Sequence, residues 1–198
     1  MSCTVGRGAK ISKINRVNKL FLDEDIKIAG DKPSLDVKKN LSNKASAKPI
    51  DSSFHENARQ WGRLVALEFI NDVKADSSKD LSDFNMIIQR RLLLSFTATV
   101  GFEQYCSDDA LCGIAQKSFI DTIKKENEEI YKTSQDTGAF SFYYLAFRRG
   151  GETDRRVGQT FAMLCSHDGD PIYQELGEAL YCWFLSVVKK NAESLDIN

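Results

Sequence analysis

The chain has 198 residues, 42% of them hydrophobic and 28% charged, and its formal net charge is −1 at pH 7. No apolar run approaches the roughly 20 residues that a membrane-spanning helix needs. The N-terminal residues also lack the continuous apolar core of a secretory signal, so the sequence predicts neither feature. This length is typical of one domain with an appendage.

Residues 1–50 are predicted to form a basic, mostly disordered tail that ends in a linker. They carry eleven Lys or Arg and five Asp or Glu, about +6, whereas residues 51–198 carry about −7. Large apolar residues are scarce in the tail, so it has little to bury. Apolar residues at helical spacing in 11–28 leave open a short basic helix that forms on contact with a partner. The charge favours a tail that folds back or that seeks an anionic partner.

Residues 51–198 are predicted to form a single all-α domain, a bundle of about six helices joined by short loops. The first helix begins at a capping box of Ser53 and Glu56 and runs to about residue 74. The second starts near Ser82 and continues through the β-branched stretch 96–100 to Gly101, which weakens the helix or allows close helix approach. The third opens at 107–109 and extends its charged end, 124–129, into solvent.

The last three predicted helices cover residues 136–149, 153–166 and 171 to about 190. Gly150 and Gly151 end the fourth helix, since glycine accepts the left-handed conformation after a helix. Asp170 caps the sixth helix and Pro171 occupies its first position, where a missing amide costs nothing. The clearest apolar stripe of the chain lies here and predicts a core-facing helix with Trp183 in mid-stripe. The stripe consists of Ile172, Leu176, Ala179, Leu180, Trp183, Phe184 and Val187.

The five cysteines include no CxxC pair and predict thiols in a reducing, cytoplasmic location. Cys165 and Cys182 lie in apolar helical surroundings, which favours buried thiols. A disulfide between Cys106 and Cys112 is the alternative, and it requires an oxidising compartment.

The candidate site is the segment 148–156, in which Arg148, Arg149, Arg155 and Arg156 flank a glycine turn. Arginine forks bind phosphate and carboxylate, and the N-terminus of the following helix offers free amides. The segment is therefore a candidate for an anionic ligand or an acidic partner. The structural alternative is that these arginines complement a helix C-terminus and pair with nearby acids.

Three other patterns have a structural explanation that we favour over a functional one. His167, Asp168 and Asp170 resemble metal ligands, but a turn before a capped helix explains them. Glu68 and Glu178 lie in apolar stretches, and a helix edge that reaches water accounts for both. The aromatic residues of 140–147 favour core packing over a ligand pocket. No catalytic or metal site and no cofactor is predicted.

The sequence favours a non-enzymatic interaction or regulatory domain that binds another protein or itself. One alternative is a nucleic-acid-associated protein that uses residues 1–50, although the acidic domain would repel phosphate. Another is a sensor or enzyme for an anionic small molecule at 148–156. The biological process and the identity of the partner do not follow from the sequence.

Overall fold

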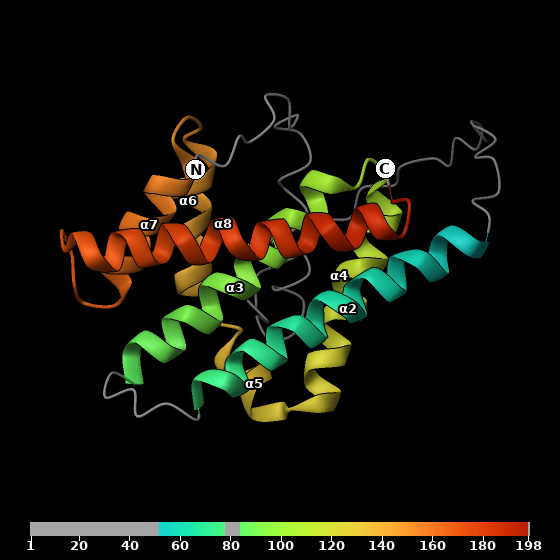
Figure 1. Cartoon of the computed structure of the whole chain (residues 1–198), viewed down its shortest axis with the longest axis horizontal. Coiled ribbons are helices and arrows are strands. Elements are labelled where there is room, and N and C mark those ends of the chain that lie inside the picture. The colour runs from blue at the N-terminus through green and yellow to red at the C-terminus, as the bar shows by residue number, and fades with distance from the viewer. Residues whose placement is uncertain (1–51, 78–83, 198) are drawn as a thin grey trace, which may run out of the picture. The chain divides into compact units, whose positions relative to one another are not determined.

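The structure is a computed structural model that describes residues 52–77 and 84–197 (Figure 1). These residues form seven α-helices and no strand, which confirms the predicted all-α class for the described part of the chain. The helices are α2 (Ser52–Ser77), α3 (Phe84–Tyr105), α4 (Asp109–Glu126), α5 (Glu128–Thr133), α6 (Thr137–Arg148), α7 (Thr153–Leu164) and α8 (Pro171–Ser194). The tail predicted in 1–50, and with it the boundary of the domain 51–198, lies outside the described residues.

α3 is the central helix of this bundle. Every residue from Leu92 to Phe102 is buried, and α3 contacts each of the other six helices. The β-branched stretch is helical, as predicted. The buried hydroxyls of Thr97 and Thr99 are satisfied there by donating to carbonyls four residues earlier, at 2.8 and 3.1 Å. Gly101 allows the predicted close approach, since a Cβ there would lie 2.8 Å from Val188 on α8.

α8 runs past two groups of helices, as the long red ribbon of Figure 1 shows. α7 packs on its N-terminal half, where a Cβ at Gly158 would lie 2.3 Å from the carbonyl oxygen of Gln174. α2 packs near its C-terminal half, where the indole of Trp61 donates to the carbonyl of Val188 at 3.0 Å. The bundle therefore holds α8 along much of one side.

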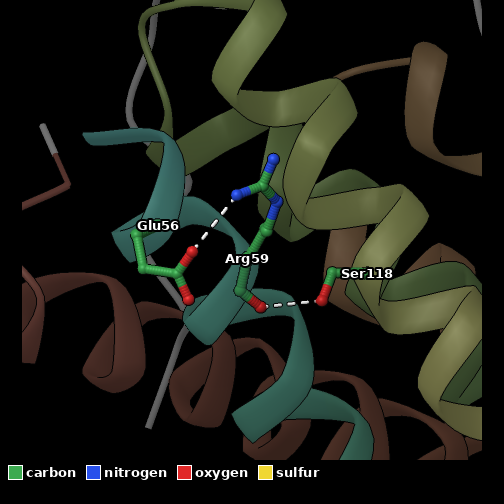
Figure 2. Close-up of polar contacts among 3 residues, drawn as sticks. All are labelled: Glu56, Arg59 and Ser118. Carbon is green, nitrogen blue, oxygen red and sulfur yellow. Dashed lines mark hydrogen bonds and ion pairs between the residues drawn. The ribbon is translucent and has the colours of Figure 1, made fainter. Parts of the chain in front are cut away.

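α2 and α4 approach each other so closely that their backbones touch. A Cβ at Gly62 would lie 2.1 Å from the carbonyl oxygen of Ala115, so only glycine fits at this crossing. Figure 2 shows the hydroxyl of Ser118 donating to the main-chain oxygen of Arg59 at 2.7 Å. On the exposed side, the guanidinium of Arg59 pairs with Glu56 at 3.1 Å.

Three predicted helix starts are confirmed by their capping bonds. The carboxylates of Asp108, Asp136 and Asp170 each accept a hydrogen bond from backbone amides of the turn that follows. The predicted end of the fourth helix is also confirmed, since Gly150 and Gly151 follow α6 with φ of 64° and 50°. Local side-chain chemistry decides these boundaries, which is why the sequence predicts them.

Two predicted helix starts and ends differ from the structure. Ser53 lies inside α2 rather than at its N-cap, and Glu56 is engaged by Arg59. The predicted third helix is two helices, α4 and α5, because Asn127 adopts an extended conformation between them (φ −161°, ψ 100°). Its side chain accepts a hydrogen bond from the amide of Ile130 and so starts α5. Because of this break, the described residues form seven helices where about six were predicted.

Candidate functional site

α8 divides its apolar residues between two faces. The side chains of Tyr181, Phe184 and Val188 are fully buried in the core. Ile172 remains 73% exposed and Trp183 remains 41% exposed. The prediction that the whole stripe faces the core was therefore wrong for Ile172, Ala179 and Trp183. The physical reason is that successive residues of a helix diverge by about 100°, so Trp183 and Phe184 cannot face the same way.

Four apolar residues make up what we call the outward face of α8: Ile172, Leu176, Ala179 and Trp183. Their spacings of four, three and four residues place them on one side of the helix. Ala179 is exposed like the two end residues, and Leu176 is half-buried. The indole of Trp183 leans on the ring of Phe184, with centroids 5.5 Å apart, so its position is supported by the core beneath it.

Charged and thiol side chains border the outward face of α8. Glu175, Cys182 and Lys189 follow one another at intervals of seven residues, so they lie along one edge of the helix. Glu175 and Lys189 are exposed and Cys182 is half-buried. Lys189 also reaches Glu193 within its own helix, at 3.6 Å. The edge therefore carries a carboxylate near the start of α8 and an ion pair near its end.

Other exposed apolar side chains in the described residues lie singly or in pairs. Phe142 and Leu145 are 49% and 59% exposed on α6, Met163 is 40% exposed on α7, and Phe84 is 73% exposed at the start of α3. Isolated apolar side chains are ordinary on a protein surface. On α8, the exposed Ile172 and Trp183 lie on one side of the helix with the half-buried Leu176 and the small Ala179 between them, which makes a surface that another chain could cover.

The four arginines of the predicted anion site have different surroundings. Arg148 ends α6 and Arg149 follows it, both exposed. Arg155 lies 3.6 Å from the carboxylate of Glu152. Arg156 is half-buried and donates to the carbonyl oxygen of Gly151 at 2.7 Å. Local partners therefore engage Arg155 and Arg156, as the structural alternative requires, and an anion or acidic-partner site at 148–156 stays a prediction.

Arg148 also belongs to a polar group between α6 and α3. The hydroxyl of Tyr144 contacts the carboxylate of Glu103 at 3.5 Å. Burial raises the pKa of Tyr144, the neighbouring charge of Glu103 raises it further, and the cation of Arg148 opposes both. The phenol is thus kept protonated, which suits a structural hydrogen bond rather than a base.

The aromatic residues of α6 pack mainly into the core. Phe96 of α3 lies within 6.3 Å, centroid to centroid, of the rings of Phe140, Tyr143, Tyr144 and Phe147. Tyr143 is fully buried, and its hydroxyl has no hydrogen-bond partner in the part of the chain that the structure describes. The geometry favours core packing over a ligand pocket for this cluster.

The other residues that the sequence analysis considered as candidates also have contacts or exposure that a structural role explains. The ring of His167 stacks on that of Tyr173, with centroids 3.7 Å apart and planes 9° apart. Its Nδ1 lies 4.0 Å from the carboxylate of Asp170, the N-cap of α8. Glu68 is exposed and Glu178 half-buried. Within residues 52–77 and 84–197, no three His, Cys, Asp or Glu side chains gather as a metal site would require.

Two further expectations concern a disulfide between cysteines and a helix that crosses a membrane. Cys106, Cys112 and Cys165 are buried and Cys182 is half-buried. None of these four is in a disulfide, so the alternative pairing of Cys106 with Cys112 is absent. No described helix is both long and apolar enough to cross a membrane.

Comparisons with known proteins found no relative for this chain: no protein-family model, no curated protein and no solved structure matches it. The functional argument therefore depends on the geometry of the described residues. Sequence reasoning nominated 148–156 and missed the outward face of α8. The signal that could have found it is that Tyr181, Leu185 and Val188 lie outside the predicted stripe and extend the apolar residues over about 240° of α8. An arc of that width cannot all face one core.

Proposed function

We propose that this chain is a non-enzymatic interaction domain that binds a protein chain through the outward face of α8. The observation that supports the proposal most is the exposure of Ile172 and Trp183, 73% and 41%, on a helix whose opposite face is fully buried. Covering a large apolar side chain contributes about 1.5–3 kcal/mol. Tryptophan is also among the residues that most often dominate binding energy at protein interfaces.

The rigidity of the platform supports the same function. α8 is anchored by the close contact with α7 at Gly158 and by the hydrogen bond from Trp61 to Val188. A preformed surface loses little conformational entropy when it binds, so more of the burial energy appears as affinity. The outward face of α8 is suited to docking as a rigid unit.

A photocrosslinking experiment tests this proposal without assuming what the bound chain is. A photoreactive residue replaces Ala179 on α8 or, as the matched control, the exposed Gln159 on α7. In cells that express the full chain, we expect covalent protein adducts from position 179 in excess over position 159. Adding Trp183→Lys should abolish the excess. Equal labelling from both positions, or none from position 179, would contradict the proposal.

The two alternatives from the sequence have weaker support. An anionic-ligand site at 148–156 needs guanidiniums that are available, whereas Arg155 and Arg156 are engaged by Glu152 and by the carbonyl of Gly151. Nucleic-acid binding through residues 1–50 concerns a segment outside the described residues. A cytoplasmic location stays an expectation from the thiol cysteines alone.

A further inference from the structure

Arg90 and Arg91 are consecutive arginines of α3 with different partners. Successive residues of a helix diverge by about 100°, so the two side chains leave α3 in different directions. Arg90 donates to the carboxylate of Asp72 on α2 at 2.7 Å, and the two side chains are only 21% and 16% exposed. Arg91 donates instead to the hydroxyl of Thr133 on α5 at 3.1 Å. Arg90 therefore has an anionic partner, whereas Arg91 contacts a neutral oxygen.

The guanidinium of Arg91 lacks a counter-charge in the described part of the chain. Arg91 is half-buried, and no carboxylate of residues 52–77 and 84–197 forms an ion pair with it. Its Nε is buried and has no hydrogen-bond partner among these residues. A cation that is removed from water without an opposite charge is unfavourable. The space beside Arg91 therefore favours an anion, and the side-chain oxygen of Thr133 lies within hydrogen-bond distance of it.

We infer that Thr133 is a phosphorylation site whose phosphate is held by Arg91. A protein kinase transfers the γ-phosphoryl group of ATP to Oγ1 of Thr133. A bond forms between Oγ1 and the γ-phosphorus, and the bond from that phosphorus to the oxygen bridging it to the β-phosphate breaks. ADP leaves with the bridging oxygen, and the hydroxyl proton passes to solvent. The new group carries a charge of about −1.5 to −2, which is the counter-charge that Arg91 lacks.

The position of Thr133 in the fold suits modification. Thr133 is half-buried and is the last residue of α5, a helix of six residues that is followed by the non-helical residues 134–136. A helix this short has little stability of its own, so opening it for a kinase costs little. Residues 126–136 carry four carboxylates and one lysine. This acidic context is complementary to a kinase with a basic substrate groove.

The adjacent Ser134 provides a matched comparison. Ser134 is fully buried, and its hydroxyl donates to the carbonyl of Tyr131 at 3.0 Å. A phosphate on Ser134 would have to displace closely packed atoms, whereas Thr133 is partly accessible. Of these two neighbouring hydroxyls, only that of Thr133 is expected to be modified.

Tandem mass spectrometry tests whether the modification occurs. The full chain is isolated, with phosphatase inhibitors present, from the cells that naturally make it, and the peptide containing both hydroxyls is sequenced. We expect phosphate on Thr133 and none on Ser134, and Thr133→Val should remove it. An absence of phosphate from Thr133 would overturn the inference.

Thermal unfolding tests the role of Arg91. Phosphothreonine is installed at position 133 during synthesis of the full chain, in the wild type and in Arg91→Gln. We expect the phosphate to raise the melting temperature of the wild type by about 2–6 °C, because charge-assisted hydrogen bonds form between α3 and α5. In Arg91→Gln the phosphate should give no increase, since a phosphate at a helix C-terminus without a cation is unfavourable. Equal shifts in the two backgrounds would contradict the assignment of Arg91.

Ser194 supplies the control for the charge itself. It is exposed and is the last residue of α8, as Thr133 is the last residue of α5. Phosphoserine at position 194 should shift the melting temperature equally in the wild type and in Arg91→Gln. A difference between the two backgrounds at position 194 as large as that at position 133 would show that Arg91 does not act locally on Thr133.

Inorganic phosphate distinguishes a free anion from the covalent group. If it stabilises the unmodified wild type but not Arg91→Gln, and mass spectrometry finds no phosphate on Thr133, Arg91 binds a free anion and the phosphorylation is wrong. None of these measurements involves α8. The inference and the proposed function can therefore fail separately.

Discussion

The two faces of α8 carry similar apolar side chains, but one face is covered by other helices and the other is exposed. Phe184 on the inner face is fully buried, and its neighbour Trp183 on the outward face is 41% exposed. The inner face is covered by α2, α3 and α7, whose contacts with α8 the structure shows. Hydrophobic stabilisation depends on area removed from water and not on residue type. The inner face therefore stabilises the fold, and the outward face retains its apolar area for association.

The largest expected effect is on the inner face. Phe184→Ala should lower the free energy of unfolding by about 3–5 kcal/mol, because it leaves a cavity in a closely packed core. Phe184 contacts Phe69 of α2 with ring centroids 6.3 Å apart, so two helices lose contacts. Urea denaturation followed by circular dichroism measures the change. A loss below about 1 kcal/mol would mean that the inner face is not the stabilising one.

A second inner-face variant tests the close contact of α8 with α7. Gly158→Val should destabilise the fold by about 1–3 kcal/mol, since overpacking forces the two helices apart. The added Cβ alone would lie 2.3 Å from the carbonyl oxygen of Gln174. Gly113→Val on α4 is the control, because a Cβ there meets nothing within 4 Å. Equal melting temperatures for the two variants would contradict the packing described here.

The buried phenol of Tyr143 makes the free energy of unfolding depend on pH. Burial raises the pKa of Tyr143, and the neighbouring Cys165 adds to the effect when ionised. The unfolded chain then loses this proton at a lower pH than the folded chain, so stability is full below about pH 10 and declines above it.

Tyr143→Phe removes that ionisation and a buried hydroxyl with no hydrogen-bond partner in the described part of the chain. Stability at pH 7 should stay level or rise by about 1 kcal/mol. The decline above pH 10 should become shallower, with Tyr144 responsible for part of what remains. Urea titrations at a series of pH values between 7 and 11 measure both effects. A variant that is less stable at pH 7 would show that the hydroxyl is satisfied in solution.

The smallest effect on folding is expected on the outward face. Trp183→Ala should lower the free energy of unfolding of the monomer by about 1 kcal/mol, well below the effect of Phe184→Ala, because 41% of the side chain is exposed and its removal leaves no closed cavity. The two variants, Trp183→Ala and Phe184→Ala, change adjacent positions of one helix, and their free energies of unfolding are compared at a concentration where the chain is monomeric. A loss as large as that of Phe184→Ala would remove the distinction between the two faces.

The sequence predicts the parts of this fold that depend on local chemistry. The carboxylates of Asp108, Asp136 and Asp170 cap helices where expected, because capping involves residues close together in the chain. The break at Asn127 was missed although Asn is a good cap, since charged residues on both sides continue the helical pattern.

The orientation of α8 could not be predicted in the same way. Whether Trp183 or Phe184 faces the core depends on where α2, α3 and α7 lie, and periodicity alone does not supply that information. For the same reason the arginines of 148–156 were recognisable as a cluster, while the engagement of Arg156 by the carbonyl of Gly151 was not. Tertiary packing decides which apolar residues remain on the surface.

The central claim is that the outward face of α8 binds a protein chain. Photocrosslinking from position 179, in the full chain and in the same chain with Trp183→Lys or Phe142→Lys, tests it most directly, since Phe142 is similarly exposed (49%) but lies on α6. Covalent protein adducts should form in the wild type and in Phe142→Lys, and they should be lost in Trp183→Lys. No adducts in the wild type, or adducts in Trp183→Lys as abundant as in the wild type, would contradict the claim.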